Sequence, residues 1–240
     1  MKTLLNIRKS GARKASIVII QMLICSSVAF AQHINVGKMR DISVSATSTE
    51  VYDAKEAFKK VIGMLDLKDS KASVTLCTSL IGAPGIPKVN IARLPKPESS
   101  SILDRNRALG AFFKKGLADF EYLDQPATHR NTEIFRSVKA LINQFTPGAS
   151  RTILIIESDF ISSGHVAEFF DYQDDPSSLM NDFDKIIAAF KADSDLPDLT
   201  GAEVILVTPG DTEIAYWSVK WWQKAFYLFG ASQVSVRAAL

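Results

Sequence analysis

Oxygen-bearing side chains stand in three separate segments of this chain, and together they could hold a hard metal cation. Asp41, Ser43 and Ser45 lie in "DISVS", Thr132 lies in "NTEIF", and Asp159 ends "RTILIIESD". Hard cations such as Mg²⁺ prefer oxygen ligands in an octahedral array and keep some positions for water or a partner. If the three segments converge, the chain would hold one such ion with a coordination position left open. That arrangement favours a binding protein over a catalyst.

The elements that must position these side chains can be read from the hydrophobic pattern. Apolar residues at helical spacing predict helices, and short runs of strand-forming residues bounded by Gly and Pro predict strands. Asp175 followed by Pro176 is predicted to start a helix, and Ser48 and Thr49 are candidate caps of an earlier one. Strands are expected at residues 33–45, 72–81, 88–94, 152–156, 202–207 and 230–236, and helices at 51–65, 103–123, 134–145, 175–190 and 211–229.

Strands that alternate with helices of this length predict a doubly wound α/β fold with a mostly parallel sheet and helices on both faces. The hairpin between residues 72 and 94 adds one antiparallel edge strand. Ligands of such sheets bind at the carboxyl ends of the strands, near the point where the strand order reverses. Asp41 ends the first expected strand, Asp159 follows the strand "TILII", and Thr132 opens a helix after a loop. All three therefore lie where this rule predicts a site.

On these segments the chain resembles the von Willebrand factor A (vWA) domain family. "DISVS" looks like its Asp-x-Ser-x-Ser strand end, "YDAKEAFKKVIGMLDLKDSKASVTLCTS" like its first helix and second strand, "NTEIFRSVKALINQF" like its threonine-bearing loop and helix, and "SRTILIIESDFISSG" like its next central strand. The resemblance implies that Asp41, Ser43, Ser45, Thr132 and Asp159 form a metal-ion-dependent adhesion site for Mg²⁺ or Mn²⁺. A carboxylate of a protein partner would complete the coordination shell.

Three positions depart from the family pattern. "GKMR", residues 37–40, is not the apolar run expected of a central strand. Phe160 stands where the family usually has glycine, which predicts crowding of the site. Asn131 precedes the threonine where the family often has glycine.

Residues 1–31 are expected to be a secretory signal peptide. Five basic residues and no acidic residue precede "IVIIQMLICSSVAFA", an apolar run shorter than the roughly 20 residues of a membrane span. "AFA" before Gln32 has the small-x-small pattern of a cleavage site. The sequence therefore predicts export to the bacterial cell envelope, either periplasmic or extracellular. An uncleaved N-terminal anchor is the alternative.

The remaining residues, 32–240, are expected to form a single domain with no membrane span. The leader holds five of the 28 Lys and Arg residues and none of the 26 Asp and Glu residues, so the rest has a formal charge of −3. That charge argues against a nucleic-acid surface. Cys77 is left without a possible disulfide partner in this part of the chain and is expected to be a buried, inert thiol.

Other readings of the sequence stay open beside the metal site. The sequence contains no nucleophile elbow, phosphate-binding glycine loop or paired-cysteine metal motif. The remaining enzyme hypothesis is a hydrolase that uses Asp159 and His165. A metal-free structural module of an envelope assembly is the third class. The acidic stretch around Asp171, Asp174 and Asp175 is read as a solvated loop rather than a calcium site. Trp217 and Trp221 are expected to pack on the sheet, with Trp222 off that stripe.

Overall fold

The computed structural model describes residues 32–43, 46, 52–65, 67, 71–82, 86–97, 101–126, 131–208 and 212–240. The signal-peptide prediction for residues 1–31 lies outside this part of the chain, as do Ser45 and the candidate caps Ser48 and Thr49. No helix within the described ranges is long and apolar enough to cross a membrane.

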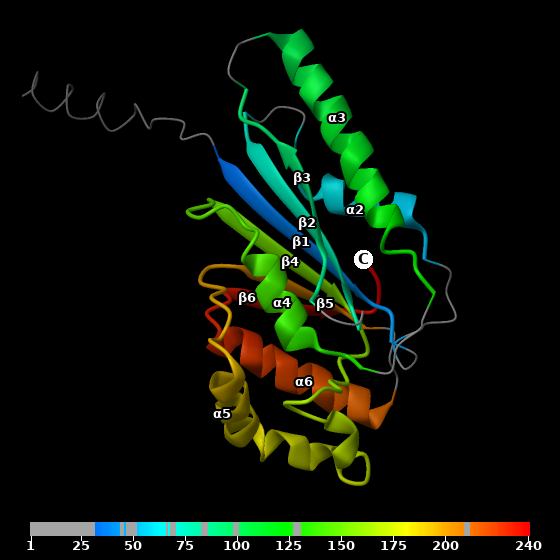
Figure 1. Ribbon diagram of the computed structural model, residues 1–240, viewed down its shortest axis with the longest axis vertical. Helices are drawn as coiled ribbons and strands as arrows, with labels where there is room; N and C mark the ends of the chain where they lie inside the picture. The colour runs from blue at the N-terminus through cyan, green and yellow to red at the C-terminus, as the bar shows by residue number, and fades with distance from the viewer. Residues whose placement is uncertain are drawn as a thin grey trace, which may run out of the picture.

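A six-stranded sheet with the strand order β3-β2-β1-β4-β5-β6 forms the centre of the molecule (Figure 1). All neighbouring strands are parallel except β3, which pairs antiparallel with β2 at one edge. The expected fold class, with its one antiparallel edge strand, is confirmed. The strands are β1 His33–Asp41, β2 Ser73–Ile81, β3 Val89–Leu94, β4 Arg151–Glu157, β5 Glu203–Val207 and β6 Gln233–Arg237.

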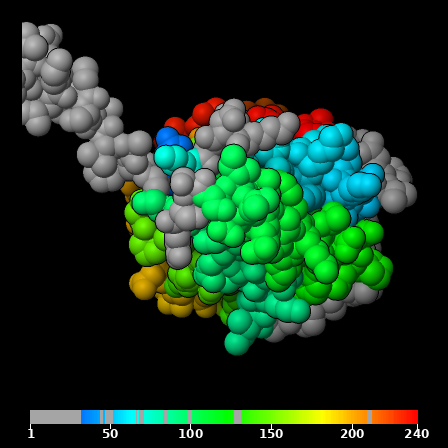
Figure 2. Space-filling model, turned by 90° about the horizontal axis from the view of Figure 1, so that it is seen from above, coloured from blue at the N-terminus to red at the C-terminus, as the bar shows by residue number. Residues whose placement is uncertain are grey.

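Helices cover both faces of the sheet. One hydrophobic cluster joins the sheet to the helices α2 Ala54–Gly63 and α3 Ile102–Glu121, which lie side by side on the surface shown in Figure 2. A larger cluster joins the opposite face to α4 Ile134–Ile142, α5 Phe183–Asp193 and α6 Glu213–Leu228. Each helix thus buries one apolar face in one of these two clusters, as the helical spacing of the sequence predicts.

The strand β1 lies in the centre of the sheet, although its residues 37–40 do not form an apolar run. It pairs with β2 on one side and β4 on the other. Lys38 is fully buried and its Nζ lies 2.5 Å from Oε2 of Glu157. The guanidinium of Arg40 lies 4.1 Å from the ring centroid of Tyr52. The polar sequence is compatible with a central position because each long side chain has a partner beneath the helices.

Helix starts differ most from the sequence prediction at α2 and at the helix expected from residue 175. The first described helix begins at Ala54, and its N-cap is Asp53, whose carboxylate accepts from the Glu56 N–H. The helix expected at 175–190 is divided into a 3₁₀ turn, η2 Pro176–Met180, and α5; another 3₁₀ turn, η1 Phe169–Tyr172, precedes them. Asp175 makes no side-chain cap, because its carboxylate accepts from the Ser177 hydroxyl at 2.8 Å.

The aromatic residues of α6 also pack differently from the expected stripe. Trp221 and Trp222 are both fully buried and contact each other edge to face, whereas Trp217 is only partly buried beside Tyr216. Trp222 was therefore wrongly placed off the buried face: α6 buries a wide face between the sheet and the 3₁₀ turns. Cys77 is buried as expected, and burial raises the pKa of its thiol to about 12.

Candidate functional site

The ends of β1 and β4 form the point where the strand order reverses. From β1 the chain crosses to β2 on one side, whereas β4, β5 and β6 follow on the other. Arg40 is paired with Glu157, so Asp41, the last residue of β1, and Ser158, the first residue after β4, lie at the same level. Crevices at such positions are the usual ligand sites of open α/β sheets. Together with Ser43, Thr132 and Asp159, these two residues make up what is called here the acidic rim.

Asp41 is a buried carboxylate held by neighbours of the same rim. Its Oδ1 accepts from the Ser43 N–H at 2.8 Å and its Oδ2 from the Ser158 hydroxyl at 2.6 Å. Burial raises the pKa of Asp41 to about 6, and the negative charge of Asp159 adds to the rise, against the lowering effect of the hydrogen bonds. No Lys, Arg or His within the described ranges forms an ion pair with Asp41.

Asp159 begins a tight turn after β4. Its Oδ1 accepts from the Ile161 N–H at 3.0 Å, and the Ser158 hydroxyl accepts from the Phe160 N–H at 2.9 Å. Phe160 has a φ of 63°, a left-handed conformation that favours glycine. Its side chain is fully buried and belongs to the cluster beneath α4 and α6, so packing holds the backbone in this conformation. The expected crowding of the rim by Phe160 is therefore corrected: the ring lies in the core.

Thr132 lies in the segment that leads into α4 and is fixed by its backbone. Its N–H donates to the Ser163 carbonyl at 2.8 Å, and its own carbonyl accepts from the Ser163 N–H and the Ser162 hydroxyl. The threonine hydroxyl is different. Oγ1 is buried and has no hydrogen-bond partner among the described residues. A buried polar atom without a hydrogen-bond partner requires an explanation, and coordination of a metal ion would be one.

Gly82 shows how closely the Thr132 segment approaches Asp41. It follows β2 with a φ of +86°, and a Cβ built there would lie 2.9 Å from the Asn131 carbonyl oxygen and 3.6 Å from Asp41 Oδ1. The residue before Thr132 and the carboxylate of Asp41 thus face the same small space. The structure therefore brings Asp41, Ser43, Asp159 and the Thr132 segment into one neighbourhood, while Ser45 lies outside the described residues.

The donor set of the rim fits a hard cation. It consists of two carboxylates and three hydroxyls, and oxygen-only sets of this kind suit Mg²⁺ and Mn²⁺ rather than zinc. Clusters of three or more His, Cys, Asp or Glu side chains that could hold a metal do not occur in the described ranges. Asp171, Asp174 and Asp175 are all exposed, in agreement with a solvated segment.

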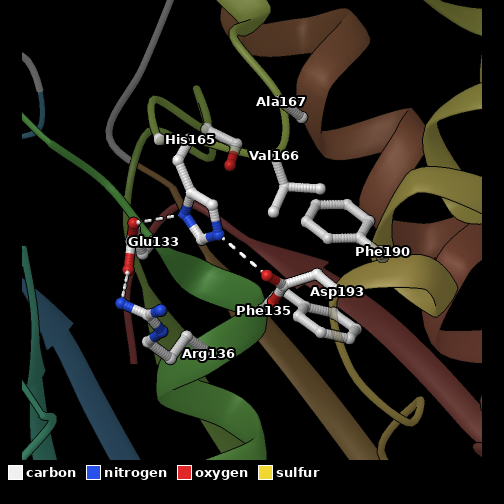
Figure 3. Close-up of a pocket in the computed structure, with 10 residues that line it drawn as sticks. Glu133, Phe135, Arg136, His165, Val166, Ala167, Phe190 and Asp193 are labelled. Atoms are coloured by element: carbon white, nitrogen blue, oxygen red, sulfur yellow. Dashed lines mark hydrogen bonds and ion pairs between the residues drawn. The ribbon is translucent and has the colours of Figure 1, made fainter.

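His165 takes part in a second polar cluster, shown in Figure 3. Its Nδ1 lies 3.2 Å from Glu133 Oε1 and its Nε2 lies 2.9 Å from Asp193 Oδ1. His165 is about half exposed, and two acidic residues, one from α5 and one from the start of α4, contact its ring. A hydrolase pairing of His165 with Asp159 is not present: both ring nitrogens face Glu133 and Asp193 instead.

Two residues of these polar clusters, Ser158 and Glu133, were not predicted from the sequence. Ser158 contacts Asp41, and its position directly before Asp159 was a signal that could have included it. Glu133 is one residue from Thr132, but nothing in the sequence pairs it with His165 across 32 positions. No protein-family model matches the chain, and no curated protein matches it.

Proposed function

We propose that the protein is an exported, vWA-like binding module of the bacterial cell envelope that associates with a protein partner through one Mg²⁺ or Mn²⁺ ion. Asp41, Ser43, Ser45, Thr132 and Asp159 would hold the ion, and an acidic side chain of the partner would take the open coordination position. The proposal rests on the resemblance of the sequence together with the composition of the acidic rim.

The observation that carries the proposal is the Thr132 hydroxyl. It is 1% exposed at the residue level and has no hydrogen-bond partner among the described residues, although its backbone is fully engaged. Leaving such a group unsatisfied costs about 1–3 kcal/mol. A cation between Thr132 and the carboxylates would accept the hydroxyl oxygen as a ligand and remove that cost.

The charge of the rim supports the same conclusion. Burial and the Asp159 charge make ionised Asp41 unfavourable, and in the described residues no basic side chain pairs with it. A divalent cation would stabilise both ionised carboxylates at once. Since the remaining ligands are neutral hydroxyls, the bound ion would keep residual positive charge and attract an acidic group of the partner.

The alternative is a metal-free module that binds its partner through the same face. It requires partner binding that is unaffected by a chelator, whereas the proposed ion predicts loss of binding. A hydrolase using Asp159 and His165 is less well supported, since both ring nitrogens of His165 face other carboxylates. A pull-down from envelope extracts with and without chelator separates the two binding modes. N-terminal sequencing of the exported protein should begin at Gln32.

The site itself is tested with Mn²⁺, whose binding is followed by the electron paramagnetic resonance of the free ion. We expect one Mn²⁺ per chain, and we expect Thr132→Val to weaken binding about tenfold or more. Thr132→Val should also stabilise the metal-free protein by about 1 kcal/mol, because a methyl group replaces an unsatisfied hydroxyl.

Thr78→Val is the matched control. Thr78 is a fully buried threonine of β2 whose hydroxyl donates to the Asp119 carbonyl at 3.5 Å, away from the rim. It should leave Mn²⁺ binding unchanged. Equal Mn²⁺ affinity of the two variants, or no bound Mn²⁺ at all, would contradict the metal site.

A further inference from the structure

His165 bridges two helices from a segment that starts at the acidic rim. It lies six residues after Asp159, and its ring stands between Glu133, at the N-terminus of α4, and Asp193, the last residue of α5 (Figure 3). The two contacts, 3.2 Å to Glu133 Oε1 and 2.9 Å to Asp193 Oδ1, use both ring nitrogens. A single side chain therefore joins three parts of the fold.

The number of protons on the ring decides whether both contacts are hydrogen bonds. An ionised carboxylate only accepts, and a neutral imidazole has one donor nitrogen and one acceptor nitrogen. Two carboxylates can thus both be satisfied only by the imidazolium form, in which both nitrogens donate. The hydrogen bonds to Asp193 and then to Glu133 raise the pKa of His165 above its ordinary value.

The same segment holds Thr132 in place. Thr132 and Ser163 exchange two backbone hydrogen bonds, and the Ser162 hydroxyl donates to the Thr132 carbonyl. Glu133 follows Thr132 directly, so His165 contacts the neighbour of the proposed metal ligand. Release of His165 from Glu133 and Asp193 would loosen the segment that carries Ser162 and Ser163.

We infer that His165 is a protonation-dependent positioning residue, a latch that holds residues 160–168 against α4 and α5 and thereby fixes Thr132 at the acidic rim. The latch is complete when the imidazole carries two protons and loses one of its two hydrogen bonds when the ring becomes neutral. Its relevance to partner binding rests on the proposed function, but the latch itself does not.

The charged groups around the ring set the direction of the pH dependence. Glu133 and Asp193 face His165, and Arg136 pairs with the other oxygen of Glu133 at 2.9 Å. Because the folded-state pKa of His165 is raised, the latch is fully formed below the unfolded value near 6.5 and is lost as the pH rises through the folded value. Acidification therefore tightens the Thr132 segment.

The test is an NMR titration of the histidine ring protons, with each signal assigned by single substitution. We expect His165 to titrate above the ordinary value, and Glu133→Gln and Asp193→Asn to lower its midpoint. His33 is an internal reference, since burial lowers its pKa. Asp184→Asn is the matched control, because it removes the same charge from the first turn of α5 and should leave His165 unchanged.

Amide exchange supplies a readout that an ordinary surface ion pair would not change. The protection factors of the Thr132 and Ser163 amides should fall as the pH passes the His165 midpoint, and His165→Gln should remove this step. A normal His165 midpoint, a midpoint insensitive to Glu133→Gln and Asp193→Asn, or protection that stays constant through the titration would overturn the latch.

Mn²⁺ titration of the same samples separates the two proposals. If the latch titrates as expected and no Mn²⁺ binds, the latch stands and the metal site fails. If Mn²⁺ binds to Asp41 and Thr132 while His165 titrates normally, the metal site stands and the latch is overturned.

Discussion

Lys38 and Asp41 both carry a buried ionisable group on the second half of β1, but their surroundings differ. Side chains of a strand alternate between the two faces of a sheet, so Lys38 and Arg40 face α2 and α3, whereas Met39 and Asp41 face the other layer. On the first face Lys38 is paired with Glu157 at 2.5 Å, and Arg40 lies 3.7 Å from the same carboxylate. The charges on this face are balanced by the chain itself.

At the acidic rim on the other side, no basic side chain of the described residues pairs with Asp41. Among the described residues its hydrogen-bond donors belong to Ser43 and Ser158, and the negative charge of Asp159 adds to the rise of its pKa. The chain neutralises the buried charge of the first cluster, whereas no basic side chain of the described residues neutralises Asp41 in the second, as the proposed ion site requires. Buried charges that the chain does not neutralise are good candidates for binding sites.

The largest effect that tests this comparison is expected at Glu157. Glu157→Ala leaves the Lys38 ammonium fully buried without its partner, which should lower the free energy of unfolding by about 3–5 kcal/mol. Lys38→Met should lower the free energy of unfolding by less. The Glu157 side chain is 27% exposed, and it retains its ion pair with Arg40 in this variant. Urea unfolding measures both. Equal losses for the two variants would show that Lys38 is not held by Glu157.

At Asp41 the same kind of substitution should have the opposite sign. The folded carboxyl, with a pKa of about 6, holds its proton more tightly than the unfolded one near 3.8, so the metal-free protein loses stability as the pH rises between these values. Asp41→Asn cannot ionise and should be more stable than the wild type at pH 7 by about 1–3 kcal/mol. It should also abolish Mn²⁺ binding.

Thermal or urea unfolding between pH 4 and pH 7 measures this difference, with Asp119→Asn as the control. Asp119 is as buried as Asp41 but forms an ion pair with Lys115 of α3. Its amide variant should lose stability rather than gain it. If the free energy of unfolding had the same pH dependence in the wild type and in Asp41→Asn, Asp41 would not be an unneutralised buried charge, and the contrast with the Lys38 cluster would fail.

The smallest expected effect concerns the backbone of the rim. At an ordered position, a protein with alanine is normally more stable than the same protein with glycine. Because Phe160 has a φ of 63°, we expect the opposite order there, with Phe160→Gly more stable than Phe160→Ala by about 1 kcal/mol. Phe169 is an equally buried phenylalanine without a positive φ, and the usual order should hold there. The same order at both positions in urea unfolding would mean that the rim stores no backbone strain.

The strands and most helices could be predicted from the sequence because their hydrophobic periodicity is local. The apolar run of β4 and the 3.6-residue spacing of α3 and α4 need no knowledge of the rest of the chain. Parallel strand ends meet at one edge, so the approach of Asp41 to Asp159 followed from the fold class alone. The ion itself stays a prediction.

The features that could not be predicted depend on partners far away in the sequence. Lys38 reads as a surface residue until Glu157 is placed beside it, and His165 reads as a lone loop residue until α4 and α5 are assembled around it. Trp222 is buried because the 3₁₀ turns pack over α6, a contact that no periodicity along the helix encodes. The N-cap of α2 is Asp53, and residue type alone does not choose among the several cap-forming residues that precede this helix in the sequence.

The position of β1 has a consequence for the order in which the protein folds. The partner of Lys38 lies 119 residues later in the chain, so the middle of the sheet is synthesised first and completed only when β4 arrives. A slip of one residue would turn Lys38 and Arg40 to the opposite face and away from Glu157. Pairing over such a separation is slow compared with local contacts. The register of β1 is therefore expected to become fixed late, in the same step that brings Asp41 next to Ser158.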